Sequence, residues 1–387
     1  MRILAAAIFL IYGISMIFPN TERFIYNNEI FALLGFSTLI FTKFKNSKIE
    51  KELYAIYIFV LYGFFEIFIS ITSITETQPY LTLRTMCIWY SCFSFFLGSY
   101  CIKQFSTKSI VSFRNRTKYL SWASLFITGF RLTPQVLFAT ISGERKAYFL
   151  LFIIAFCVIK GGATSYTALL AALILYASVY FSQIRKFFGK KTLLLIIFCF
   201  MVSLYFLAPV LANFLAVGYD GVGGDNNITW RLMLWIYLFN EVFLNNPIFG
   251  IGFGTPLFNL ATAPGFITSD DGSRLTEYTL GTHNSFFFVS LRLGSIGLIL
   301  IALIHYRLFS RAIKSLREHK DHVSKGITLS LILAAILFVN SALFNVVLES
   351  PLYASNYWFT LGLMYQFSSR ALKAANKTRT NEISTEL

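Results

Sequence analysis

The sequence predicts an all-α polytopic membrane protein of about twelve transmembrane helices, with one large hydrophilic loop that holds helices of its own. Three observations predict this class. Of the 387 residues, 56% are hydrophobic and 13% are charged, about half the charged share of ordinary soluble domains. Apolar runs near the roughly 20 residues that a spanning helix needs recur along the chain. Most Lys and Arg residues fall in clusters between these runs.

The expected spans follow one another along the chain. Clear candidates, the second of them short, are 3–19, 29–43, 53–74, 84–102, 165–184, 191–212, 284–306, 326–345 and 353–369. Because no small-residue cleavage site follows the first run, we expect it to be a retained span. Shorter apolar blocks occupy 119–130, 133–143 and 147–159. The first two of these blocks predict tilted or broken helices that line a cavity, since irregular backbone is not tolerated against lipid.

Charge sets the expected orientation. Placing the basic clusters in the cytoplasm gives twelve crossings with both termini inside, as the positive-inside rule requires. The resulting divisions are nine transmembrane segments in 1–212, a large outer loop at 213–283, three segments in 284–369 and a cytoplasmic tail at 370–387. The tail is polar after Leu372 and is expected to lack regular structure.

The net charge of +15 does not predict nucleic-acid binding, because the basic residues form no continuous face. The five cysteines lie in or beside apolar runs. Neither a disulfide framework nor a thiol-rich metal site is expected from them.

Arg231 is the first candidate for chemistry in the outer loop, within a helix expected at 227–245. Its neighbours on the same helical face are apolar (Leu234, Trp235, Leu238), so a cation projects from an apolar stripe. Two interpretations stay open. The charge either reaches water at the membrane surface, or it binds an anion, because a planar guanidinium binds phosphate oxygens in pairs.

Residues 246–254 alternate glycine with apolar side chains after this helix. Neither the spacing nor a preceding strand–helix–strand unit fits a dinucleotide-binding fingerprint. The run predicts a turn, whose backbone amides are available to face an anion.

His283 and Asn284 stand at the outer mouth of the span expected at 284–306. In this topology His283 is the only histidine on the outer side, and its imidazole titrates in the range that suits a general base. The amide of Asn284 is placed to orient it. Gly294 and Gly297 follow near the same helical face and predict a slot for another helix or a lipid chain. A purely structural histidine is the alternative.

Other cations are candidates for a supporting role. Lys160 and Arg131 occupy outer positions where they would complete a phosphate site, or serve as helix-end anchors. Arg292 follows His283 by nine residues, which places it on roughly the opposite face of the helix, so it is expected outside the site. Because an isolated charge within a span is costly, we expect Arg292 to pair with Glu66, the only acid deep in another apolar run.

These features together resemble the superfamily of bacterial O-antigen ligases and polymerases. The residues that carry the resemblance are the Arg231 helix, the turn Asn246-Pro247…Gly250-x-Gly252-x-Gly254, and His283-Asn284 followed after nine residues by Gly294-x-x-Gly297. The likeness is close over about 228–300 and loose over the rest of the chain.

The resemblance implies a metal-independent, cofactor-free, inverting glycosyltransferase of the GT-C type in the bacterial inner membrane, with its site facing the periplasm. The implied donor is a glycan on undecaprenyl pyrophosphate. The implied acceptor is a lipid-linked repeat unit or lipid A core. The resemblance also implies contact with membrane lipid and is compatible with a partner protein that regulates chain length. Arg231 is carried over as a pyrophosphate ligand and His283 as the group that activates the acceptor hydroxyl. Lys160, Arg131, Asn284 and Gly294 are the further residues expected to contact substrate.

The chain departs from the pattern at 160–165. Many members, the ligases especially, have a Ser-Arg pair where this chain has Lys160-Gly-Gly-Ala-Thr-Ser165. The departure favours a polymerase, which extends the chain onto the next lipid-linked unit, over a ligase, which transfers it to lipid A core.

A transporter or flippase for lipid-linked sugars is the alternative of another class. Ion-coupled transport usually leaves intramembrane carboxylates and repeated halves, whereas this chain shows one deep acid and no repeat. An enzyme predicts that Arg231 and His283 converge at one outward-open cavity, and a transporter predicts a polar cavity at the membrane midplane.

Overall fold

The computed structural model describes residue 8 and residues 29–43, 50–72, 79–106, 108–110, 226–258, 282–319 and 322–386. The elements assigned within them are all helices, which agrees with the predicted all-α class. The predicted spans within 119–212, together with Arg131 and Lys160, lie outside the described residues.

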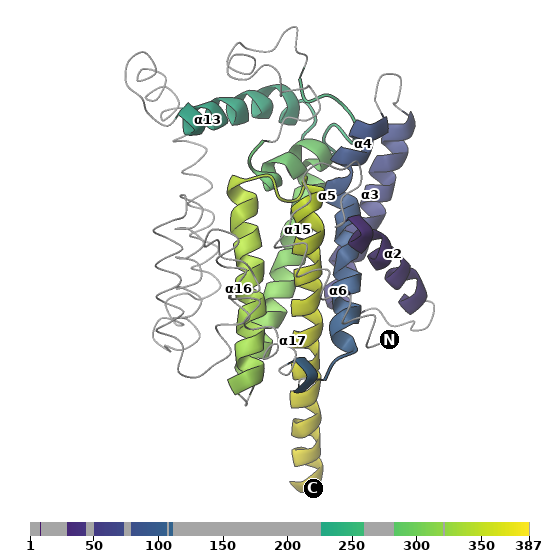
Figure 1. Ribbon diagram of the computed structural model, residues 1–387, viewed down its shortest axis with the longest axis vertical. Helices are drawn as coiled ribbons and strands as arrows, with labels where there is room; N and C mark the ends of the chain where they lie inside the picture. Colours follow the sequence, from purple (N-terminus) through teal and green to yellow (C-terminus); the bar gives the residue numbers. More distant parts are fainter. Residues whose placement is uncertain are drawn as a thin grey trace.

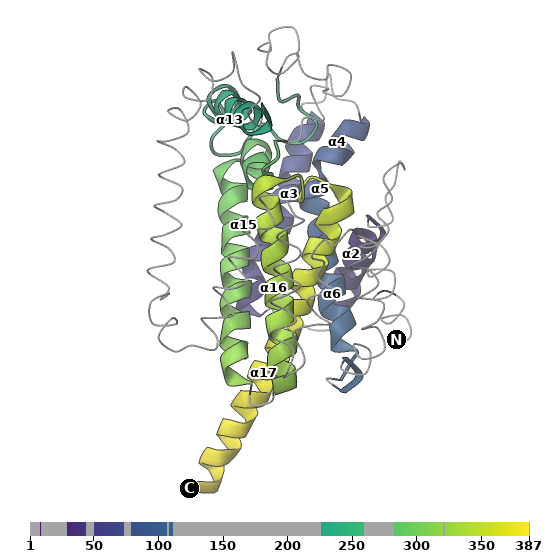
Figure 2. The same ribbon diagram turned by 60° about the vertical axis from the view of Figure 1, so that its left-hand side comes forward.

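The helices form a bundle with one helix laid across its end. In chain order they are α2 (Glu29–Lys43), η1 (Lys51–Leu53), α3 (Tyr54–Thr72), α4 (Pro79–Thr85), α5 (Cys87–Tyr90), η2 (Ser91–Phe93), α6 (Ser94–Lys103), α13 (Asn226–Leu238), η3 (Phe239–Phe243), α15 (Ser285–Glu318), α16 (His322–Phe344) and α17 (Pro351–Glu386). Figures 1 and 2 show α13 across one end of the bundle, while α17 projects from the other (Figure 1, Figure 2).

Four stretches in the described part of the chain are long and apolar enough to cross a membrane. They are Lys51–Ser70, Thr82–Lys103, Ser285–Glu318 and Ser324–Phe344, and they correspond to the predicted spans 53–74, 84–102, 284–306 and 326–345. Large apolar side chains stay exposed on α2 and α3, among them Phe41 at 77% and Leu61 at 68%. Such faces suit lipid, so the chain is a multi-pass membrane protein. The total of twelve spans stays a prediction.

α17 is the central helix of the bundle and differs from its prediction. It packs against α2, α6, α15 and α16, and its polar side chains Ser355, Asn356 and Thr360 are buried. A helix surrounded by protein needs no lipid-like surface, which explains the modest hydropathy of this span. The expectation of an unstructured tail after Leu372 is wrong, because α17 continues to Glu386.

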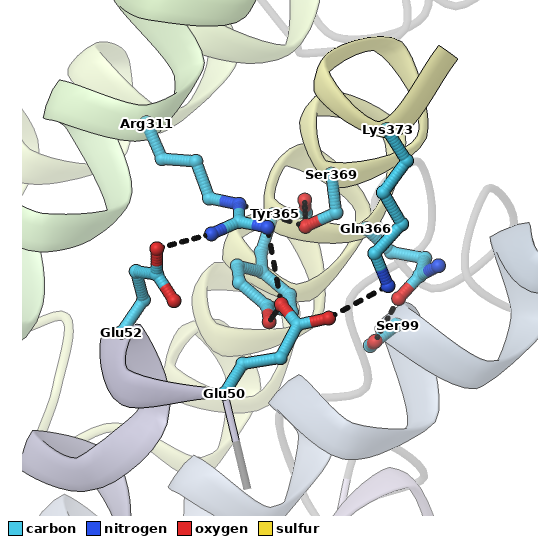
Figure 3. Close-up of polar contacts among 8 residues, drawn as sticks. All are labelled: Glu50, Glu52, Ser99, Arg311, Tyr365, Gln366, Ser369 and Lys373. Atoms are coloured by element: carbon cyan, nitrogen blue, oxygen red, sulfur yellow. Dashed lines mark hydrogen bonds and ion pairs between the residues drawn. The ribbon is translucent and has the colours of Figure 1, made fainter. Parts of the chain in front are cut away.

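A cluster around Glu50 ties the start of α3 to α15 and α17 (Figure 3). The Glu50 carboxylate accepts hydrogen bonds from Arg311 at 3.0 Å, from Lys373 at 2.8 Å and from Tyr365. Arg311 also pairs with Glu52 at 2.6 Å. Several shared charges hold the three helices in one register more firmly than an isolated surface pair.

α15 is bent at Gly294, where the backbone has φ 61° and ψ −165°. The part before the bend turns across the end of the bundle that carries α13 (Figure 1). The rings of Phe286 and His305, one from each part, consequently meet with centroids 6.0 Å apart. The predicted span 284–306 is therefore not one straight helix, and α15 extends beyond it to Glu318.

Candidate functional site

Arg231 lies on α13, in the helix that the sequence predicts. Leu234 and Leu238, one and two turns further on, are fully buried at 0% exposure and hold this face of α13 against the bundle. The Arg231 guanidinium donates from Nη1 to the carbonyl oxygen of Phe344, the last residue of α16, at 3.0 Å. Beyond Leu238 the helix widens into the π-helical turn η3, which ends at Phe243.

His283 sits in a tight turn directly before α15. Its φ of 51° is the only positive φ of a non-glycine residue in the described ranges. Such a conformation costs about 1–3 kcal/mol and persists only where neighbours enforce it. Here Thr282 donates its hydroxyl to the Asn284 carbonyl at 2.8 Å, and the Asn284 side chain accepts from the Phe287 amide at 3.0 Å. Asn284 is thus the N-cap of α15.

Arg231 and His283 come together at this end of the bundle. The indole N–H of Trp235 donates to the Thr282 carbonyl at 2.5 Å, which joins α13 to the histidine turn. Burial lowers the pKa of the half-buried His283, and the positive charge of Arg231 lowers it further. The imidazole is therefore neutral at neutral pH and can accept a proton.

The loop between α16 and α17, residues 345–350, forms a third part of the site that the sequence analysis missed. Ser285, the first residue of α15, accepts hydrogen bonds from the amides of Val347 and Leu348 at 2.8 and 3.1 Å. Its hydroxyl reaches Glu349 Oε2 at 2.5 Å. The loop is therefore held against the residue two positions after His283.

The carboxyl group of Glu349 is buried, although the residue as a whole keeps some exposure. Burial raises its pKa to about 7, and the hydrogen bonds from Ser285 and from the loop amides only partly offset this. Its second oxygen, Oε1, is buried without a hydrogen-bond partner among the described residues. A neutral carboxyl tolerates that arrangement better than a carboxylate.

The glycine run repairs the bend in α15 and does not present its amides to a ligand. The amides of Ile251 and Gly252 donate to the carbonyls of Leu291 and Arg292 at 2.9 and 3.0 Å. In turn, the amides of residues 295 and 296 donate to the carbonyls of residues 247 and 248 at 2.9 and 3.3 Å. A continuous helix would pair 295 with 291 and 296 with 292, so the inserted loop satisfies these four backbone groups in place of the helix.

Two further amides of this run are also engaged, by side chains of neighbouring helices. Phe253 donates to the Ser70 hydroxyl at 3.0 Å and Gly254 to the Thr85 hydroxyl at 2.8 Å. The predicted anion-facing role of these amides is therefore corrected to a structural one.

The predicted lipid slot at Gly294 is already filled. A side chain added there would lie 2.0 Å from the Ile248 carbonyl oxygen and 2.6 Å from the Phe249 amide nitrogen. The small residue allows a backbone, not a lipid, to approach α15. Gly294 shapes the site through the bend, and its expected contact with substrate stays a prediction.

The expected ion pair between Arg292 and Glu66 does not form among the described residues. Arg292 is fully buried, and its Nη1 instead donates to the carbonyls of Gly252 and Thr255 at 3.3 and 2.5 Å. Its guanidinium also lies 5.3 Å from the centre of the Phe288 ring. Gly252 in the glycine run and Thr255 directly after it thus supply backbone oxygens where the sequence suggested a carboxylate.

The described geometry defines a class of site: a guanidinium and a neutral imidazole held together at one end of a membrane helix bundle. This combination suits transfer to a hydroxyl nucleophile with an anionic leaving group. Residues 148–302 match the family model described as O-antigen ligase. The match confirms the predicted resemblance to the O-antigen ligase and polymerase superfamily. None of the curated proteins matches the chain.

The matched segment contains Arg231, His283, Asn284 and Gly294, and in sequence also Lys160. Arg131 and Glu349 lie outside it. The match supports O-antigen ligase or polymerase function in general, that is, a membrane glycosyltransferase-like enzyme that acts on lipid-linked glycans.

Proposed function

We propose that the chain is a polymerase of O-antigen or a related surface polysaccharide. In this proposal it transfers a glycan from undecaprenyl pyrophosphate to the next lipid-linked repeat unit, on the periplasmic side of the bacterial inner membrane. The single observation that carries the proposal is the meeting of Arg231 with a neutral His283. Transfer to a hydroxyl needs a general base beside the group that binds the leaving phosphate, so this pairing favours an enzyme.

The proposed step is a direct displacement at the anomeric carbon. The acceptor hydroxyl oxygen forms a bond to that carbon as the bond to the pyrophosphate oxygen breaks, and its proton passes to His283. The electron pair leaves with undecaprenyl pyrophosphate, and the sugar configuration is inverted. No metal is needed in this scheme, because the guanidinium of Arg231 offsets the charge that develops on the leaving group.

Arg231 influences His283 differently before and after the donor binds. Before the donor binds, the charge of Arg231 helps to keep His283 unprotonated. A bound pyrophosphate would offset this charge, so the imidazolium that forms during transfer would be stabilised when it is needed. A guanidinium has five N–H donors, which allows Arg231 to be anchored by Phe344 and still bind phosphate oxygens.

Asn284, Lys160 and Arg131 take supporting roles in the proposal. The Asn284 Oδ1 is engaged as a helix cap, so its NH₂ group is the part that would reach a substrate oxygen. Lys160 would add a point charge, and Arg131 a second guanidinium, for the second phosphate.

Reconstitution tests the proposal directly. The purified full chain in proteoliposomes receives undecaprenyl pyrophosphate-linked repeat units, and the lipid-linked products are separated by size. We expect a ladder of multimers without any lipid A core, and no ladder from the His283→Ala variant. His319→Ala is the matched control, because His319 contacts Thr328 at the other end of α15.

The outcomes separate the candidate functions. A ladder from His283→Ala equal to that of the wild type would refute the proposed mechanism. Product that forms only when lipid A core is supplied would identify a ligase, the function that the description of the matched family names. Substrate that crosses the bilayer with no new glycosidic bond would identify a transporter.

A further inference from the structure

We propose that Glu349 is a positioning residue of this site: its carboxyl group fastens the α16–α17 loop to the start of α15 and thereby sets His283 against Arg231. The inference rests on the proposed function for the roles of His283 and Arg231. Glu349 lies outside the segment that the family model matches.

Ser285 is the point at which this fastening occurs. A hydroxyl has one donor and two acceptor sites. Both acceptor sites of Ser285 are taken by loop amides, those of Val347 and Leu348. The donor can serve Glu349 Oε2 at 2.5 Å or the Asn345 carbonyl at 3.1 Å. The shorter of the two contacts indicates that the Ser285 hydroxyl donates its hydrogen bond to Glu349.

Arg231 is anchored directly before this loop, at the end of α16. Its guanidinium donates to the carbonyl of Phe344, five residues before Glu349. One short segment of chain therefore contacts the arginine at its beginning and the histidine turn at its end. A shift of this segment would change the spacing of the two groups, and a displacement near 1 Å can lower a rate by about 100-fold.

The chemistry of Glu349 argues against a role in packing alone. The Asn345 carbonyl would satisfy the Ser285 hydroxyl without burying an acid, and burying a carboxyl group with an unpartnered oxygen is costly. The carboxyl group of Glu349 therefore has a role that a main-chain acceptor does not fill. A second bond from the loop constrains the turn in which His283 is held at a positive φ.

Kinetics of three variants test the inference in the same reconstituted system. Glu349→Ala and Ser285→Ala should each lower kcat by about 10- to 100-fold with little change in KM for the donor. Glu349→Gln keeps an uncharged group with a carbonyl acceptor and should retain most of the activity. The double variant should be no worse than Ser285→Ala alone, because that substitution already removes the contact to Glu349 together with the hydroxyl's bonds to the loop amides.

Ser290→Ala is the matched control, since Ser290 donates only within its own helix, to the Phe287 carbonyl. We expect its kcat to equal that of the wild type. If Glu349→Ala does not fold, Ser285→Ala decides the test. Wild-type kcat in the Glu349→Ala or Ser285→Ala variant overturns the inference, as does a Glu349→Gln variant as slow as Glu349→Ala.

The His283→Ala variant distinguishes this failure from failure of the proposed function. An inactive His283→Ala beside a fully active Glu349→Ala removes only the positioning role. A fully active His283→Ala removes both, because nothing then remains for Glu349 to position.

Discussion

The indole of Trp235 donates to the carbonyl oxygen of Thr282, the residue directly before His283. This bond joins two segments that are 47 positions apart in the sequence. Trp235 lies one helical turn after Arg231, so the bond also sets how far the guanidinium stands from the imidazole.

Removing this bond should reduce activity more than stability. Trp235→Phe keeps an aromatic ring on α13 but loses the N–H, and we expect polymerisation to fall by about tenfold as the histidine turn loosens. Trp358→Phe is the control, because the Trp358 N–H has no hydrogen-bond partner among the described residues. Equal rates in Trp235→Phe and the wild type would show that the turn does not depend on α13.

The pH dependence of activity should report the charge of Arg231. That charge lowers the pKa of His283, so the Arg231→Gln variant should have a higher His283 pKa. Because the neutral imidazole is the active form, the acidic limb of kcat/KM should move to higher pH in this variant. Arg317→Gln, at the far end of α15, should leave the limb in place. If the acidic limb does not move in the Arg231→Gln variant, the charge of Arg231 does not affect the pKa of His283.

Stability should depend on pH through Glu349. Its folded pKa of about 7 lies above the ordinary value of 4.5, so the folded protein holds a proton that the unfolded chain releases. Stability from this group is complete below the ordinary value and is lost as pH rises through about 7. The loss is on the order of 3 kcal/mol.

Thermal unfolding in detergent between acidic and mildly alkaline pH measures this effect. The Glu349→Gln variant should lose less stability than the wild type as pH rises. Glu241→Gln, an exposed acid on η3, should follow the wild-type curve. Parallel curves for the wild type and Glu349→Gln would show that the acid is not protonated in the fold.

The bend in α15 should not tolerate a side chain. Gly294→Ala places a methyl group 2.0 Å from the Ile248 carbonyl and imposes a positive φ on an alanine. The backbone conformation alone costs about 1–3 kcal/mol, so we expect a markedly lower melting temperature. Ile299→Ala on the same helix, where the side chain is 57% exposed, is the control. A Gly294→Ala protein as stable as this control would contradict the loop insertion.

The Glu50 cluster should depend on Glu50 more than on Glu52. Glu50 accepts from three donors, whereas Glu52 pairs with Arg311 alone among the described contacts. Glu50→Ala should therefore destabilise the protein by roughly 1–3 kcal/mol, and Glu52→Ala by less. Equal melting temperatures for the two variants would show that the cluster is not cooperative.

Features that local pattern determines were predictable from the sequence. The helix around Arg231 and the position of His283 at the mouth of a span follow from hydrophobic periodicity and from a single polar group beside an apolar run. Their mutual approach was expected from the resemblance. It depends on contacts such as that of Trp235 with Thr282, which no local pattern contains.

Features that depend on distant partners were missed or wrongly assigned. In the sequence Glu349 looks like an ordinary acidic residue in a loop, because its partner Ser285 lies 64 positions earlier. Gly294 correctly indicated a close approach, but a glycine does not reveal what fills the space. Arg292 required a partner, and sequence reasoning considers carboxylates before main-chain carbonyls. The glycine run and the residue directly after it supplied those carbonyls.

The bend at Gly294 has a consequence for how the chain enters the membrane. The part of α15 after it, up to Glu318, measures about 36 Å at 1.5 Å per residue and is long enough to cross alone. The insertion machinery can accept that part as a complete span and release the preceding nine residues with the loop. Phe344, which accepts a hydrogen bond from Arg231, and Glu349, which contacts the start of α15 at Ser285, are synthesised later. The arrangement of Arg231 and His283 is therefore complete only when the last two helices have joined the bundle, and a nascent chain that stops before them lacks it.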